Sequence, residues 1–130
     1  MATKSKTKTK KKTTKAAESS LDKLVQSHTS LGLLCGELAR DSQLPWKTRK
    51  IFESYAWAIF EQVKALRATD LTTVPNDFLD AATREVKEAI AAGSAAKASH
   101  SPTDAALAVV ETHQAIDAVD GILGRNNPSA

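Results

Sequence analysis

The chain contains few residues that would constrain it covalently or break its regular structure. Among 130 residues it has one cysteine, Cys35, with five glycines and four prolines. A single cysteine excludes an intramolecular disulfide and a cysteine-based metal cluster. Because disulfides persist mainly in oxidising compartments, this cysteine content favours a reducing, intracellular location.

Long hydrophobic runs are also missing. The longest apolar run is only a few residues, far below the roughly 20 that a membrane-spanning helix needs. Residues 1–15 contain little that is apolar beyond Met1 and Ala2 and contain no arginine, so neither a secretory signal nor a mitochondrial presequence is predicted. The residue after Met1 is not the glycine that myristoylation requires. We expect a soluble intracellular protein without membrane contact, with the cytoplasm and the nucleoid or nucleus left open.

Acidic residues are absent from the first seventeen positions, which carry seven lysines. Removing these from the 18 basic residues leaves 11 against 15 acidic ones, so a net charge of +3 combines a tail of +7 with a body of −4. Repulsion between like charges and the lack of apolar area predict that residues 1–17 are disordered. Mobile lysines bind nucleic acid through counterion release, without sequence preference. The predicted phosphate-binding residues of this segment are Lys4, Lys6, Lys8, Lys10, Lys11, Lys12 and Lys15. A solubility role and a targeting role for the same lysines remain open alternatives.

Alternating strand patterns are missing as well, and residues 18–130 instead show four segments with helical spacing. The predicted fold class is all-α: an up-and-down four-helix bundle preceded by the disordered lysine-rich tail. The first helix begins near Ser19 or Ser20, where Asp22 assists capping. The second has Pro45 at its first helical position and runs to about Ala68. The apolar seam predicted for the first helix is Leu21, Leu24, His28, Leu31, Cys35 and Leu38.

The remaining two helices are predicted from about Phe78 to Ile90 and from Ser101 to the GRNNP segment. Residues 91–101, rich in alanine, glycine and serine, are interpreted as a flexible link. The seam predicted for the last helix is Ala105, Val109, Thr112, Ile116, Val119 and Leu123.

The start of the second helix departs from the pattern of the others. Acidic residues near a helix N-terminus complement its dipole, and the other three starts have them, whereas this one reads PWKTRKIF. An anion would relieve the conflict, since free amides and cations can bind a phosphate while an indole stacks on a base. The candidate nucleic-acid contacts here are Trp46, Lys47, Arg49 and Lys50. In the alternative interpretation Arg49 pairs with Glu53, Lys50 faces water and Trp46 closes the end of the bundle.

Three residues are candidates for binding another protein. Gly32 and Gly36 lie four residues apart in the first helix, at a cost in helix propensity that a close approach of another helix would explain. Trp57 lies off the main apolar stripe of the second helix, so it contacts either another helix or a partner.

Motifs that would indicate an enzyme are not found. The chain has no phosphate-binding glycine loop, HExxH, GxSxG or CxxC. His28 and Cys35 are about 10 Å apart on one helix, which is too far for a shared proton, and are interpreted as core residues. His113, Asp117 and Asp120 share a face and are interpreted as an exposed polar surface. We therefore expect no catalytic residues, cofactor or metal.

Two functional hypotheses follow. In the first, the chain is a non-enzymatic nucleic-acid-associating protein whose tail binds phosphates nonspecifically and whose helical body oligomerises or recruits a partner. In the second, the body is a helical protein–protein interaction or scaffold module, or a helical coat of a hydrophobic surface, and the tail serves solubility or targeting.

Overall fold

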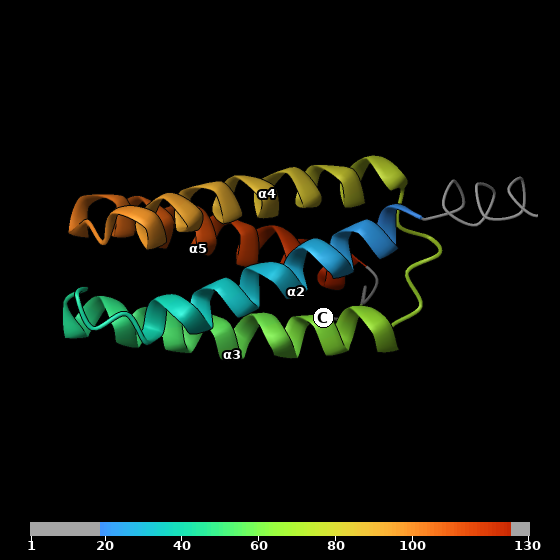
Figure 1. Cartoon of the computed structure of the whole chain (residues 1–130). Coiled ribbons are helices and arrows are strands. Elements are labelled where there is room, and N and C mark those ends of the chain that lie inside the picture. Colours follow the sequence, from blue (N-terminus) through green and yellow to red (C-terminus); the bar gives the residue numbers. More distant parts are fainter. Residues whose placement is uncertain (1–18, 126–130) are drawn as a thin grey trace, which may run out of the picture.

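The computed structural model describes residues 19–125, and these form a bundle of four helices without strands (Figure 1). The helices are α2 (Ser20–Ala39), α3 (Trp46–Ala68), α4 (Asn76–Ser99) and α5 (Pro102–Arg125). The predicted all-α fold class and the four-helix bundle are confirmed. The lysine-rich segment 1–17, predicted to be disordered, lies outside the described residues.

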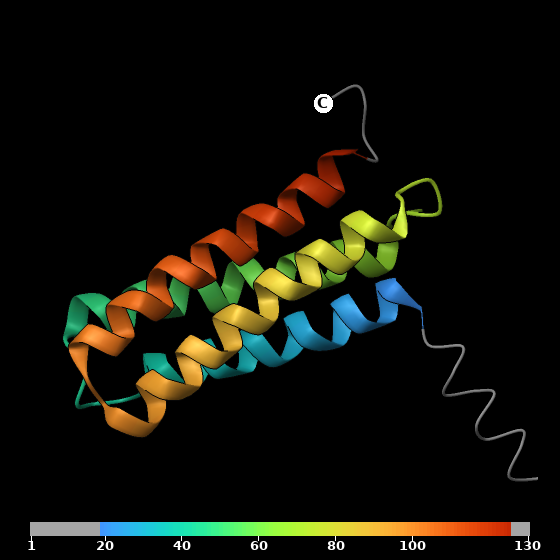
Figure 2. The same ribbon diagram turned by 90° about the horizontal axis from the view of Figure 1, so that it is seen from above.

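The helices alternate in direction but are not arranged in sequence order around the bundle. α2 packs against α3 and α4, and α5 packs against α4 and α3, so that α3 and α4 lie on a diagonal. Connections 40–45 and 100–101 lie at one end, and connection 69–75 lies at the other end with Ser19 (Figures 1 and 2). The fold is therefore two helical hairpins, α2/α3 and α4/α5, packed together.

Local sequence explains where the helices begin. Ser19 caps α2: its Oγ accepts a hydrogen bond from the Asp22 amide at 3.0 Å, and the Asp22 carboxylate accepts one from the Ser19 amide at 3.5 Å. Ser101 Oγ accepts hydrogen bonds from the Thr103 and Asp104 amides at the start of α5. Pro45, predicted as the first residue of the second helix, is instead the N-cap residue before α3. Pro75 precedes α4 in the same way, and neither proline provides a side-chain cap.

The core runs along the axis of the bundle. His28 and Cys35 of α2 are buried in it, as predicted, with exposed fractions of 0% and 1%. Its largest fully buried side chain is that of Phe52 on α3. Burial of leucine, isoleucine, valine and phenylalanine side chains supplies most of the stabilisation, about 1.5–3 kcal/mol for each side chain.

The flexible link predicted over residues 91–101 is wrong, because α4 continues as a helix to Ser99. Five of the nine residues from Ala91 to Ser99 are alanines, which have the highest helix propensity. Gly93 faces α2, where a Cβ would lie 2.7 Å from Leu34 Cδ2, so a larger residue would require the Leu34 side chain to move. The small residues that suggested a loop are those that allow α2 and α4 to pack closely.

The predicted seam of α5 is partly correct. Ala105, Thr112 and Val119 are buried, whereas Val109, Ile116 and Leu123 are only partly buried at the edge of the core. Ala108, Ala115 and Ile122 complete the buried stripe. Alanines contribute weakly to a hydrophobic pattern, which is why the stripe was predicted about one position away from its true centre.

Candidate functional site

Gly32 and Gly36, which lie one turn apart on α2, have different surroundings. A Cβ on Gly32 would lie 2.9 Å from Phe60 Cζ and 3.1 Å from Ile59 Cγ2, so α3 packs directly against this position. A Cβ on Gly36 would have Arg40 Nη1, at 3.7 Å, as its nearest neighbour. The close helix approach predicted for both glycines exists at Gly32 only.

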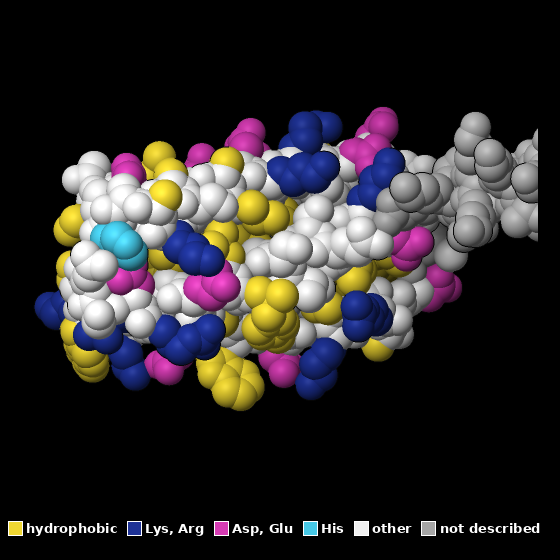
Figure 3. Space-filling model, viewed as in Figure 1, with side chains coloured by type: hydrophobic (Ala, Val, Ile, Leu, Met, Phe, Trp, Pro, Cys, Tyr) yellow, Lys and Arg dark blue, Asp and Glu magenta, His cyan; other side chains and the backbone are white. Residues whose placement is uncertain are grey.

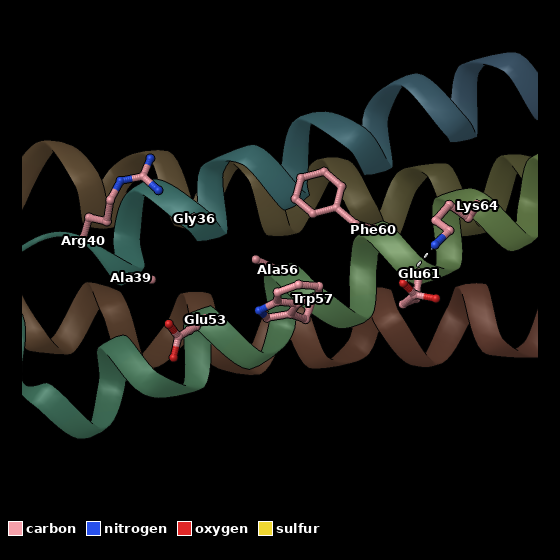
Figure 4. A pocket seen from close by; sticks show the side chains of 9 residues that line it. All are labelled: Gly36, Ala39, Arg40, Glu53, Ala56, Trp57, Phe60, Glu61 and Lys64. Atoms are coloured by element: carbon pink, nitrogen blue, oxygen red, sulfur yellow. Dashed lines mark hydrogen bonds and ion pairs between the residues drawn. The ribbon is translucent and has the colours of Figure 1, made fainter.

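Beside Gly36 the surface contains a groove of about 620 Å³ between α2 and α3. The small residues Gly36, Ala39 and Ala56 leave room between the two helices, while Trp57 and Phe60 supply its aromatic surface (Figure 4). Trp57 is 70% exposed, the largest exposed fraction among the exposed large hydrophobic residues of the described range. The structure thus places Gly36 and Trp57, two of the three predicted partner-binding residues, in one groove.

Charged residues of both signs surround the groove. Its polar lining consists of Arg40 from α2 and Glu53, Glu61 and Lys64 from α3. Lys64 Nζ lies 3.3 Å from Glu61 Oε2 (Figure 4), and Glu53 Oε1 lies 2.9 Å from the Lys50 ammonium. The lining therefore has two positive and two negative groups. In the space-filling view, hydrophobic side chains emerge over α2 and α3 between charged ones (Figure 3).

The basic start of α3 forms a second surface feature. Trp46 is 63% exposed, and Lys50 Nζ lies 5.8 Å from the centre of its ring, within cation–π range. Lys50 rather than Arg49 pairs with Glu53, so the alternative interpretation had the wrong partner for Glu53. The exposure of Trp46 also shows that it does not close the end of the bundle.

Arg49 of this basic surface is half-buried, and its Nε has no hydrogen-bond partner within the part of the chain that the structure describes. The pKa of Asp41 is lowered mainly by hydrogen bonds from His100 and from the Gln43 amide. The positive charge of Arg49 lowers it slightly further. Lys47 is exposed. A cationic and aromatic surface is therefore present at this end of the bundle.

This surface lies at the opposite end of the bundle from Ser19, where residues 1–18 join the described chain (Figure 1). The 20 residues of α2 separate the two ends by about 30 Å. An extended chain of 17 residues can span more than this distance, so the separation does not prevent both features from binding one nucleic acid.

A polar network crosses the interior of the bundle. His28 Nε2 lies 2.7 Å from Gln62 Oε1, and Gln62 Nε2 donates to the Ile116 carbonyl at 2.9 Å and to Asp120 Oδ1 at 2.7 Å. Because Gln62 Oε1 can only accept, His28 Nε2 carries the proton in this contact. Burial lowers the pKa of His28, and the Gln62 hydrogen bond and the Asp120 charge oppose this shift only in part. The network joins α2, α3 and α5.

Cys35 and His113, two other candidates for chemistry among residues 19–125, have different surroundings. Burial raises the pKa of the Cys35 thiol to about 12, despite its hydrogen bond with Thr112, so the reactive thiolate is disfavoured. His113 Nε2 lies 3.4 Å from Asp117 Oδ2 on the surface, whereas Asp120 turns towards Gln62. Among residues 19–125 no group of three or more His, Cys, Asp or Glu side chains is placed to hold a metal ion.

His100, which the sequence suggested lies in a loop, has a defined position. It ends α4 in the left-handed conformation with φ 56°, and its Nδ1 lies 2.8 Å from Asp41 Oδ2. The contact joins the two connections at this end of the bundle.

The described residues define a small four-helix bundle with a partly aromatic groove on one hairpin. None of its helices, within the described range, is long and apolar enough to cross a membrane. No protein-family model, curated protein or solved structure matches the chain.

Most residues of the groove were not predicted as partner-binding from the sequence. Trp57 was recognised because it departs from the apolar stripe, and Gly36 because of its spacing from Gly32. The remaining lining residues follow the same outer stripe of α3 or face it from α2, and a search for residues flanking Trp57 at helical spacing would have found Glu53, Phe60, Glu61 and Lys64.

Proposed function

We propose that this chain is a non-enzymatic nucleic-acid-associating protein, in which residues 1–17 bind phosphates and the helical body binds another protein chain. The observation that carries the proposal is the segregation of charge: seven lysines and no acid in the first seventeen residues, ahead of a body with more acidic than basic residues. Binding through counterion release requires only accessible cations, so the composition is sufficient for this role.

The geometry supports a division of labour between tail and body. The body has an aromatic groove on α2/α3 and a basic surface at the start of α3, about 30 Å from Ser19 along the bundle. Association of bodies would bring several tails together, and linked weak sites bind more tightly than isolated ones.

A salt titration tests the role of the tail. Labelled duplex DNA, single-stranded DNA and RNA are titrated with the full chain and with a full-length variant in which the seven tail lysines are replaced by glutamine. The native chain should bind duplex DNA with a slope of log K against log salt of up to about −6, because each phosphate neutralised by one of the seven lysines contributes about −0.9. The variant should lose at least about tenfold in affinity and most of that slope.

The basic start of α3 is tested separately with Lys47→Gln/Lys50→Gln. The matched control is Arg84→Gln/Lys87→Gln, which removes two exposed charges of α4, outside the α2/α3 groove. If the α3 surface belongs to the binding site, only the first pair reduces the slope, by about two. An unchanged affinity and slope in the tail variant would show that the nucleic-acid role is wrong.

A second candidate function is a helical interaction module whose tail serves solubility or targeting. It is favoured by the groove, where a tryptophan 70% exposed stands beside the small residues Gly36, Ala39 and Ala56. Tryptophan is among the residues most often responsible for binding energy at protein interfaces. A chain that binds no nucleic acid in the titration but binds a protein through Trp57 would support this candidate.

A further inference from the structure

The α3 residues that line the groove are arranged symmetrically along the helix. They form three pairs about the midpoint between Ala58 and Ile59, and these pairs are Glu53 with Lys64, Ala56 with Glu61, and Trp57 with Phe60. When two copies of a helix pack antiparallel about a twofold axis, each residue faces the residue at the same distance on the other side of that axis. Any helical stripe with alternating spacings of three and one has such pairs, so the suitability of the groove for a second copy depends on which residues occupy the paired positions.

Two of the three pairs, Trp57 with Phe60 and Glu53 with Lys64, are favourable in chemistry as well as in position. Trp57 of each copy would lie against Phe60 of the other, and aromatic pairs contribute beyond the area they bury. Glu53 of each copy would face Lys64 of the other, which brings opposite charges together twice. The groove lining carries equal numbers of positive and negative groups, so two such faces do not repel each other.

The surrounding surface is compatible with close contact. Gly36, Ala39 and Ala56 leave space between α2 and α3 for an approaching side chain. Leu33, which follows the Gly32 packed against Ile59 and Phe60, is 61% exposed and lies nearly level with the proposed axis. It would add apolar area at the centre of the contact.

We propose that this groove binds the same face of a second copy of the chain, forming an antiparallel, twofold-symmetric dimer centred between Ala58 and Ile59. The inference rests on the part of the proposed function that assigns protein binding to the body, and it does not depend on the lysine tail. Ser19, the N-cap of α2, lies 13 residues before Gly32, so the two Ser19 residues would lie about 40 Å apart along the dimer, at its opposite ends.

Sedimentation velocity of the full chain without nucleic acid tests the dimer. Samples from about 10 µM to about 1 mM cover the affinities of small interfaces, and about 0.15 M salt screens the tails from each other beyond roughly 8 Å. Trp57→Ala should weaken association about tenfold or more, while Trp46→Ala, an exposed tryptophan on the same helix outside the groove, should leave it unchanged. Helical content by circular dichroism controls for folding.

The twofold arrangement is tested by exchanging charges between copies. Glu53→Lys places two lysines opposite each other, and Lys64→Glu places two glutamates opposite each other, so each variant alone should dimerise more weakly than the native chain. An equimolar mixture of the two should recover association, because every pair across the interface is again of opposite sign. The proposal is overturned if the native chain stays monomeric. It is also overturned if Trp57→Ala and Trp46→Ala have equal effects, or if the mixture associates no better than either variant alone. The sedimentation experiment tests only the dimer, and the DNA titration tests only the role of the tail. Each proposal can therefore fail without the other.

Discussion

Three successive turns of α2 meet the rest of the bundle in three different ways. At His28 the contact is a hydrogen bond to Gln62, at Gly32 it is the ring of Phe60, and at Gly36 the space remains open as part of a groove. The two glycines show that a small residue in a helix does not by itself indicate a close helix–helix contact. What stands opposite decides it: Phe60 fills the space at Gly32, whereas the alanine side chain of Ala56 lines the groove near Gly36 without filling it.

The sharpest way to break this comparison is Gly32→Val. The new side chain would overlap Phe60 Cζ and Ile59 Cγ2, and overpacking of this kind costs about 1–3 kcal/mol. The free energy of unfolding should fall by that amount in urea titrations. Gly36→Val, one turn further, serves as the matched control and should cost clearly less. Equal losses for the two variants would mean that the filled and open positions do not differ in packing.

The buried His28 of α2 should make the stability of the protein depend on pH. Burial lowers the pKa of folded His28, whereas the unfolded residue titrates near its ordinary value of about 6.5. As the pH falls below about 6.5 the unfolded chain binds the proton first, so stability is complete above this pH and declines as the pH approaches the folded pKa. The slope has a limit of about 1.4 kcal/mol per pH unit.

Urea unfolding between pH 8 and pH 5 measures this dependence. The control is His28→Leu, which lowers stability at every pH because Gln62 loses its partner, but should remove the part of the slope caused by His28. The same slope in both proteins would assign the pH dependence to other groups.

The smallest effect is expected where the groove is open. Gly36→Ala adds a methyl group whose nearest neighbour is the flexible end of Arg40 at 3.7 Å, and it replaces the least favourable helical residue after proline. The free energy of unfolding should rise by about 0.5–1 kcal/mol. A loss of stability would show that Gly36 is packed more tightly than the structure indicates.

Several features of the fold could be predicted because they depend on neighbouring residues in the chain. The start of α2 followed from Ser19 and Asp22, and that of α5 from Ser101 and Asp104, since capping is a local interaction. The extension of α4 to Ser99 was missed because glycine and serine suggested a loop. In the structure, Gly93 lies inside the helix and faces Leu34 of α2 at close range.

The candidate site was only partly predictable for the same reason. Trp57 and Gly36 were identified one at a time, from an irregular position in a stripe and from a spacing. That they line one groove depends on the relative position of α2 and α3, which no local pattern encodes. Gln62 was not identified at all, because a glutamine within a helix resembles a surface residue until His28 and Asp120 are brought beside it.

By itself, the sequence determined the charge segregation, the four helices and most of their buried faces, because these depend on composition and on periodicity within single segments. The tertiary structure decided that Gly32 is packed against α3 while Gly36 borders open space, that His28 Nε2 bonds to Gln62, and that Trp57 lines a groove. Each of these results depends on the residue that faces a position from another helix, and that pairing exists only once the helices have packed.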